Sequence, residues 1–323
     1  MNNNHFLDLN ELPDSPYGKI STSYSQLNIE LNRYERHSTT KLRKLIAEDS
    51  KITSDQVLIE AGGDGALSLL FKYCHQYSIN LHLPRNSYSG FQDIAKLNNN
   101  SFNYYDSFSR NNVLSISNHI DSQKSAIIIC HPDNPTGIFN DHWYEWIENY
   151  KGLIFIDEAY IEYSTERSLR FLLNKENLNV VIIRTFSKAY GAASLRLGYI
   201  LSSPSFIKRL SPLQLPYPVS THSLEVGCLL IKQKKDVLKK VEKIKNLCLS
   251  LRCSFIGLGF TCTQTSTNFF LVTKSIFSNL GKIHKELITF GFYTNLILSD
   301  QKEIIGLRIS TGNQETNTKL IKS

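Results

Sequence analysis

The feature that most constrains the fold is a series of short apolar runs separated by helical segments. Four runs carry almost no charge: 81–84 (LHLP), 126–130 (AIIIC), 153–157 (LIFID) and 180–185 (VVIIRT). Continuous apolar runs of this length are typical of strands buried on both faces, and the segments 91–98 and 141–150 between them have a helical pattern. The alternation therefore predicts an α/β fold whose mostly parallel central sheet lies between helices.

A glycine-rich turn joins another predicted strand to a helix. The run 57–62 (VLIEAG) leads into Gly62-Gly63-Asp64-Gly65, and the apolar stretch 66–74 starts a helix. Backbone N–H groups at a helix N-terminus favour a phosphate, so Gly63 and Asp64 are candidate phosphate ligands. The turn lacks the Gly-Lys-Ser/Thr of a Walker A loop and the GxGxxG of a dinucleotide site.

The segment 185–199 (TFSKAYGAASLRLGY) places a lysine where a predicted strand ends. Under an apolar wall, Lys188 can be held as the neutral amine that attacks carbonyl groups. Arg196, eight residues later, could hold an anion of the same ligand. A surface Ser-Lys pair beside an ordinary arginine is the alternative, and this segment alone does not distinguish the two.

Polar residues follow one predicted strand after another. In doubly covered sheets the ligand binds outside the carboxyl ends of the strands. The candidates at these ends are Gly63, Asp64, Asn134, Asp157, Tyr160, Ser187 and Lys188. A ligand that needs a phosphate seat, a carboxylate, an aromatic ring and a Schiff-base lysine is pyridoxal phosphate, which we therefore expect as the cofactor.

The motifs resemble, in order and spacing, those of the fold-type I, class I/II aminotransferases that depend on pyridoxal phosphate. The resemblance to the histidinol-phosphate aminotransferase group runs from about Leu7 to Lys319, and threonine-phosphate decarboxylase is a close relative. Together with the composition, it predicts an N-terminal arm (1–30), a large cofactor-binding domain (31–205) and a smaller α+β C-terminal domain (206–323).

The resemblance gives five residues roles around the cofactor ring. Lys188 resembles the catalytic lysine that holds the cofactor covalently, and Asp157 in FIDEAY resembles the catalytic carboxylate that keeps the pyridine nitrogen protonated. Tyr160 and Asn134, the latter in HPDNPTG, resemble the donors to the phenolic oxygen. Tyr88 in NSYSGF resembles the tyrosine that stacks on the ring.

A second set resembles the cup that holds the cofactor phosphate. It contains Gly63, Asp64, Ser187 and Arg196. Tyr34 in RYER resembles the tyrosine that reaches this phosphate from the partner subunit. The resemblance therefore implies a homodimer that shares its active sites across a two-fold interface.

The substrate side departs from the family pattern. Arg308 in LRISTG resembles the arginine that clamps the anionic group of the substrate. Members that use phosphate esters carry a second arginine where this chain has Asn295 in GFYTN, and Arg85 or Lys19 are candidates to replace its charge. The sequence leaves open whether the donor is phosphorylated.

The resemblance implies a transaminase that moves an amino group between two small molecules. The donor would be an amino acid or an amino-alcohol phosphate similar to histidinol phosphate, and the acceptor a 2-oxo acid such as 2-oxoglutarate. Two alternatives stay open: a decarboxylase of an amino-acid phosphate with the same cofactor, and a cofactor-free binding protein that places its positive charge on nucleic acid.

Composition and charge pattern give no sign of a basic nucleic-acid-binding arm or of a membrane span. The net charge is +7, and its densest block, 232–245, has Val237 and Val241 at the spacing of an amphipathic helix with a solvated face. Six cysteines form neither a CxxC pair nor a zinc-finger spacing, so we expect no metal site. No apolar run approaches the ~20 residues of a membrane span, and no signal pattern opens the chain, which predicts a cytoplasmic location.

Overall fold

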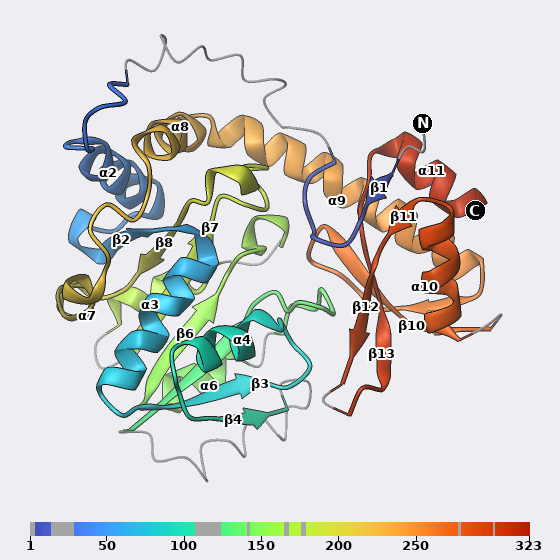
Figure 1. Cartoon of the computed structure of the whole chain (residues 1–323), viewed down its shortest axis with the longest axis horizontal. Coiled ribbons are helices and arrows are strands. Elements are labelled where there is room, and N and C mark those ends of the chain that lie inside the picture. Colours follow the sequence, from blue (N-terminus) through green and yellow to red (C-terminus); the bar gives the residue numbers. More distant parts are fainter. Residues whose placement is uncertain are drawn as a thin grey trace.

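The computed structural model describes residues 4–13, 29–106, 124–140, 143–164, 168–175, 179–276, 279–299 and 301–323. All predicted cofactor-binding residues, together with Arg308, Asn295 and Arg85, lie in these ranges. Lys19 and most of the predicted N-terminal arm lie outside them. Figure 1 shows a larger part built on one sheet and a smaller part built on another, with α9 (Lys234–Gly257) running between them.

A seven-stranded sheet forms the larger part, with the order β2-β8-β7-β6-β5-β3-β4. Its strands are β2 (Val57–Glu60), β3 (Asn80–Pro84), β4 (Phe102–Tyr105), β5 (Ser125–Cys130), β6 (Leu153–Asp157), β7 (Asn179–Thr185) and β8 (Gly198–Leu201). The pairs among β3, β4, β5, β6 and β7 are parallel, and β8 is antiparallel to both of its neighbours. The predicted mostly parallel central sheet is confirmed.

Two apolar layers cover this sheet, because alternate side chains of each strand point to opposite faces. On β6, Ile154 and Ile156 join the first layer, whereas Phe155 joins the second. The first layer packs α2 (Ser38–Ser50), α6 (Trp143–Asn149) and α8 (Thr221–Lys232), and the second packs α3 (Gly62–Gln76), α4 (Gly90–Leu97) and α7 (Pro204–Leu210). Burial on both faces explains why the strands read as unbroken apolar runs.

The smaller part is a four-stranded antiparallel sheet with helices on it, in the order β12-β13-β10-β9. Its elements are β9 (Phe260–Cys262), β10 (Phe269–Ser275), α10 (Leu280–Thr289), β11 (Phe292–Tyr293), β12 (Asn295–Leu298), β13 (Ile304–Ser310) and α11 (Gln314–Lys322). The N-terminal strand β1 (His5–Phe6) pairs in parallel with β11. The start of the chain therefore lies beside its last third.

Helix α8 lies between the segment 211–220 (SPLQLPYPVS) and the lysine-rich helix α9, and the sequence did not predict it. Ser220 caps α8 by accepting from the N–H of Ser223 at 3.2 Å. Residues 234–245 of the lysine-rich block lie in the amphipathic helix α9. Its Val237 and Val241 pack in the first apolar layer of the large sheet. Cys248, further along α9, packs in the core of the smaller part. We therefore propose a domain boundary inside α9, whereas the predicted boundary at 205 remains untested.

The described helices are short or polar. The longest, α9, has 24 residues and carries many lysines. Among the described ranges, no helix combines the length and the apolar character that crossing a bilayer requires.

Candidate active site

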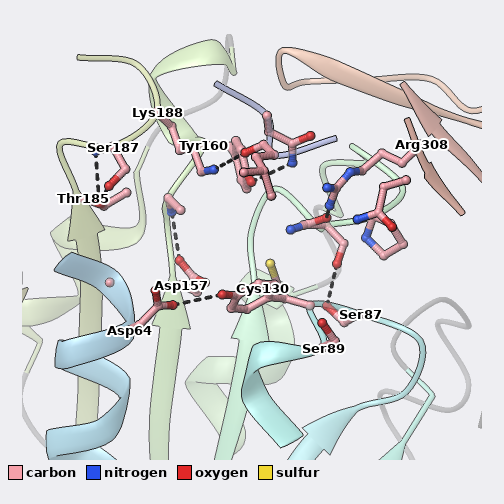
Figure 2. Close-up of a pocket in the computed structure, with 18 of the residues that line it drawn as sticks. Asp64, Ser87, Ser89, Cys130, Asp157, Tyr160, Thr185, Ser187, Lys188 and Arg308 are labelled. Carbon is pink, nitrogen blue, oxygen red and sulfur yellow. Dashed lines mark hydrogen bonds between the residues drawn. The ribbon is translucent and has the colours of Figure 1, made fainter. Parts of the chain in front are cut away.

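The candidate site is a cavity of about 630 Å³ at the carboxyl ends of the large sheet's strands. Both sheets and the N-terminal segment line it. The predicted residues on its wall are Gly63, Asp64, Tyr88, Asn134, Asp157, Tyr160, Ser187, Lys188, Arg196 and Arg308. Figure 2 shows Ser187, Lys188, Asp64 and Asp157 toward the left of the cavity and Arg308 at its upper right, with Tyr160 between them.

Lys188 follows β7 and points its amine into the cavity. The Nζ atom donates a hydrogen bond to the carbonyl of Leu9 at 2.7 Å and lies 5.7 Å from the ring centroid of Tyr160. Burial, together with the positive charge of Arg308, lowers the pKa of Lys188 to about 8. A substantial fraction of the side chain is therefore the neutral amine near that pH, as the nucleophile requires.

Asp157 is the last residue of β6 and is buried. Burial raises its pKa to about 7, although the N–H of Ala159 donates to Oδ1 at 3.0 Å and opposes that rise. A carboxylate in this setting gains from a positive charge placed beside it. The protonated nitrogen of a pyridine ring is a partner of that kind.

The predicted phosphate seat lies where α3 begins next to β8. Gly62 has φ +78°, a left-handed conformation that glycine adopts without strain, and a Cβ on Gly198 would lie 2.5 Å from the carbonyl carbon of Gly62. These two glycines let the helix N-terminus approach the strand. Arg196 leans over the seat and pairs with Asp64, Nη2 to Oδ2, at 3.1 Å.

Ser187 and Tyr88 border the seat on either side. The N–H of Ser187 donates to Oγ1 of Thr185 at 3.1 Å, and the two hydroxyl oxygens are 3.0 Å apart. Tyr88 donates from its hydroxyl to Oδ1 of Asp64 at 3.0 Å and packs edge-on against Phe91. Thr185 was not predicted. Thr185 is the first residue of the segment 185–199, and neither its charge nor its spacing from other residues indicates a role.

Asn134 and Arg308 meet on the opposite side of the cavity. Nη1 of Arg308 donates to Oδ1 of Asn134 at 2.5 Å, and Nη2 donates to the carbonyl of Asp8. The Arg308 side chain is buried, and burial lowers its pKa. Its Nε is also buried and has no hydrogen-bond partner among the described residues. The amide of Asn134 keeps its Nδ2 as a donor.

Sequence reasoning missed the part played by the N-terminal segment. Asp8, Leu9 and Asn10 each accept from or donate to a predicted site residue, namely Arg308, Lys188 and Tyr160. The segment 7–13 (LDLNELP) lies at the start of the region that resembles the family, but nothing in its sequence indicates which side chains it would contact. Those contacts exist because β1 pairs with β11 and carries the segment across the cavity.

Tyr34 lies away from the cavity of its own chain. Its side chain is 76% exposed and stacks on Tyr217 with ring centroids 4.6 Å apart. Residues 29–35 and 217–223 line a separate surface hollow there. The predicted contact between Tyr34 and the cofactor phosphate of the partner subunit remains a prediction.

A buried ion network ties together the strand ends under the site. Arg184, on β7, donates from Nη1 to Oε2 of Glu158 at 3.0 Å and also pairs with Glu162. Glu158 follows Asp157 directly and accepts from the N–H of Leu169 at 2.6 Å. The network therefore joins the end of β6, which carries Asp157, to the end of β7, which leads to Lys188.

The residues present fit pyridoxal phosphate on three independent observations. The cradle between Gly62 and Gly198 leaves no room for a Cβ and opens beside Arg196. The buried carboxyl of Asp157 has a pKa raised by its surroundings. The amine of Lys188 lies in the same cavity, whose volume is within the ~300–1,000 Å³ usual for small-ligand sites.

Comparisons with known proteins agree with this geometry. The model of the family "Aminotransferase class I and II" matches residues 10–322. The chain is 29% identical to a histidinol-phosphate aminotransferase of Flavobacterium psychrophilum, over 90% of this chain and 85% of that protein. It is 33% identical to one from Methanosphaera stadtmanae, over 73% and 66%.

Solved structures show the same fold at lower identity. Histidinol-phosphate aminotransferase from Sinorhizobium meliloti, solved with pyridoxal 5'-phosphate, has a TM-score of 0.85 at 19% identity and covers 98% of this chain and 89% of its own. L-threonine-O-3-phosphate decarboxylase from Porphyromonas gingivalis has a TM-score of 0.77 at 19% identity, with 90% and 89% covered. The chain belongs to the class I and II aminotransferase family, and its cofactor is pyridoxal phosphate.

Proposed function

We propose that this aminotransferase takes an amino group from an amino acid or from an amino-alcohol phosphate similar to histidinol phosphate and passes it to a 2-oxo acid such as 2-oxoglutarate. The observation that carries the proposal is the convergence of Lys188, Asp157 and Arg308 on one cavity. Asp157 is the last residue of β6, Lys188 follows β7, and Arg308 lies on β13. The cofactor supplies the electron sink for the chemistry when it is bound.

The chain's own residues divide the work. Lys188 holds the cofactor and, once the donor has replaced it, moves a proton at the donor's α-carbon. Asp157 stabilises positive charge at the ring nitrogen, and Tyr160 and Asn134 donate to the phenolic oxygen. Arg308 binds the anionic group of the donor with its buried guanidinium.

The cofactor phosphate has its own set of proposed ligands. They are the backbone of Gly63 and Asp64 at the start of α3, together with the side chains of Ser187 and Arg196. Tyr88 packs on the ring. A helix N-terminus and a guanidinium are both favourable partners of a phosphate.

The donor class can be narrowed on the strand opposite Arg308. Asn295 on β12 is the direct cross-strand neighbour of Arg308 on β13, where side chains lie roughly 4.5–5.5 Å apart at Cβ. A neutral amide therefore stands beside the guanidinium. Arg85 packs over the ring of Tyr104, 5.1 Å from its centroid, rather than on the cavity wall. One guanidinium fits one carboxylate, which favours an α-amino acid over a phosphate monoester of about −1.5 to −2 charge.

The test follows the half-reaction by absorbance in cofactor-loaded protein, with donor alone and no acceptor. We expect conversion with α-amino acids, and a gain of at least ~10-fold with histidinol phosphate in Asn295→Arg, since a hydrogen bond to a charged group contributes about 1.5–3 kcal/mol. Asn295→Gln is the matched neutral control. A wild-type protein that converts histidinol phosphate tenfold faster than every amino acid contradicts the narrower donor class and leaves the transaminase intact.

Decarboxylation of an amino-acid phosphate is the alternative that shares this cofactor. The named sequence relatives are aminotransferases, whereas the decarboxylase appears among structures similar in fold. Release of CO2 in the absence of any 2-oxo acid would support the decarboxylase. Transfer that stops after one turnover without an acceptor would support the transaminase.

We also propose a cytoplasmic homodimer. The hollow lined by residues 29–35 and 217–223 contains the exposed pair Tyr34 and Tyr217, a suitable surface for a second copy. In that dimer, Tyr34 of the partner subunit would reach the cofactor phosphate. Sedimentation of the loaded protein at the mass of one chain would contradict the dimer.

A further inference from the structure

Asn10, in the N-terminal segment, takes part in hydrogen bonds through both its backbone and its side chain. It is 1% exposed and has φ +55°, a left-handed conformation that asparagine tolerates better than most residues. Its N–H donates to Oγ of Ser310 at 3.1 Å, and its carbonyl accepts from Nδ2 of Asn268 at 3.0 Å. Its backbone is therefore fixed to β13 and to the residue before β10.

The side chain of Asn10 has one defined orientation. Ser310 accepts from the backbone N–H of Asn10 and turns its own proton to Oδ1 of Asn10, 2.7 Å away. With Oδ1 occupied in this way, the Nδ2 group faces Tyr160 and donates to its hydroxyl oxygen at 2.9 Å. An NH₂ group can donate but cannot accept.

This contact decides what the Tyr160 hydroxyl can do. A phenolic hydroxyl has one proton to give and can accept through its oxygen. Because Asn10 occupies the oxygen as a donor, the proton of Tyr160 cannot go to Asn10. Tyr160 is buried except where it lines the cavity beside Lys188, so its proton is directed at a ligand there.

We infer that Asn10 is a positioning residue that makes Tyr160 a hydrogen-bond donor to the cofactor. The inference rests on the proposed role of Tyr160 as a hydrogen-bond donor to the phenolic oxygen of the cofactor. It adds a role for a segment about 150 residues away in sequence. It also makes the donor state of Tyr160 depend on the smaller sheet, because Ser310 sets the amide of Asn10.

The experiment is a pH titration of the visible absorption band of the cofactor-loaded protein in five forms: wild type, Tyr160→Phe, Asn10→Asp, the double variant and Ser310→Ala. Asp tolerates the left-handed backbone and keeps the acceptor for Ser310, but it replaces the NH₂ by an acceptor that takes the Tyr160 proton. The visible band reports protonation of the nitrogen that joins Lys188 to the cofactor. Loss of a hydrogen-bond donor to the cofactor's phenolic oxygen raises the proton affinity of that nitrogen.

We expect the midpoint of this pH titration to rise by about one pH unit in both Asn10→Asp and Tyr160→Phe. One pH unit is a tenfold change in proton affinity. The double variant should titrate like Tyr160→Phe alone, since Asn10 acts through the tyrosine. Ser310→Ala should lower the melting temperature and move the midpoint less than Asn10→Asp does.

Three results would overturn the inference, and they have different meanings. If Tyr160→Phe titrates like the wild type, the proposed role of Tyr160 fails and the inference falls with it. If Tyr160→Phe shifts the midpoint but Asn10→Asp does not, Asn10 has only a structural role. If the two shifts add in the double variant, the charge of the new carboxylate acts directly on the cofactor rather than through Tyr160.

Discussion

The two walls of the cavity are built in different ways. The wall proposed to hold the cofactor, called the cofactor wall, comes from the strand ends of one sheet and consists of Asp64, Asp157, Ser187, Lys188 and Arg196. The substrate wall is assembled from both ends of the chain and consists of Asp8, Leu9, Asn10, Asn295 and Arg308. Parallel sheet topology thus fixes the wall that holds the cofactor. The wall that faces the donor depends on how the smaller sheet and the N-terminal segment pack, so specificity can change without touching the chemistry.

The largest effect is expected from Lys188→Ala, which removes the proposed nucleophile of the cofactor wall and, in the substrate wall, only its hydrogen bond to the carbonyl of Leu9. Overall transfer should fall by at least ~10³-fold, because covalent and acid–base roles are both lost. Transfer is measured as 2-oxo acid formation under saturating cofactor. Full activity in this variant would remove Lys188 from the mechanism altogether.

The next largest effect concerns the support under the cofactor wall. Arg184→Met leaves the carboxylates of Glu158 and Glu162 buried without their cation, so the free energy of unfolding should fall by about 3–5 kcal/mol. Lys41→Met, which breaks the exposed pair with Glu225, is the matched control and should cost less than ~1 kcal/mol. Chemical denaturation of the cofactor-free protein measures both. Equal losses in the two variants would mean that the buried network does not brace the wall.

The pH dependence of stability tests the burial of Asp157. Its pKa is raised from an ordinary value near 3.8 to about 7, so the folded protein binds the proton more tightly than the unfolded chain. This group therefore stabilises the cofactor-free protein fully below about pH 4, and the contribution is lost as the pH rises through 7. The slope is at most about 1.4 kcal/mol per pH unit.

Asp157→Asn should make the free energy of unfolding less dependent on pH between about 4 and 7, because the amide does not titrate. Denaturation midpoints of wild type and variant, measured every half unit from pH 4 to pH 8, give the difference curve. Other buried acids such as Asp133 contribute equally to both proteins and cancel. A difference curve that rises with pH would show that Asp157 is paired rather than desolvated in the folded state.

The same contrast explains what the sequence could predict. The strands before Asp157 and Lys188 are read from unbroken apolar runs, and the polar residues after them fall at one sheet edge for a topological reason. No comparable rule links Asn10 to Tyr160 or Asn295 to Arg308, since strand register and the pairing of β1 with β11 are set by packing between distant segments. Helix α8 was not predicted for a related reason: it directly follows the segment 211–220, whose three prolines are typical of a loop.

The smallest effects are expected from two matched arginine substitutions, one in each wall. Together they test whether the cofactor wall and the substrate wall act independently. Arg196→Lys and Arg308→Lys each keep the charge but lose the planar fork. We expect Arg196→Lys to weaken cofactor binding about tenfold and to leave the donor half-reaction unchanged once cofactor is saturating. Arg308→Lys should raise the donor concentration needed for half-conversion about tenfold at unchanged cofactor affinity, because its guanidinium lies against Asn134 and Asp8 rather than at the phosphate seat. Cofactor titration by absorbance and donor titration of the half-reaction supply the two measurements for each variant. If either substitution moves both constants equally, the walls are coupled, and the division between a cofactor side and a donor side does not describe this cavity.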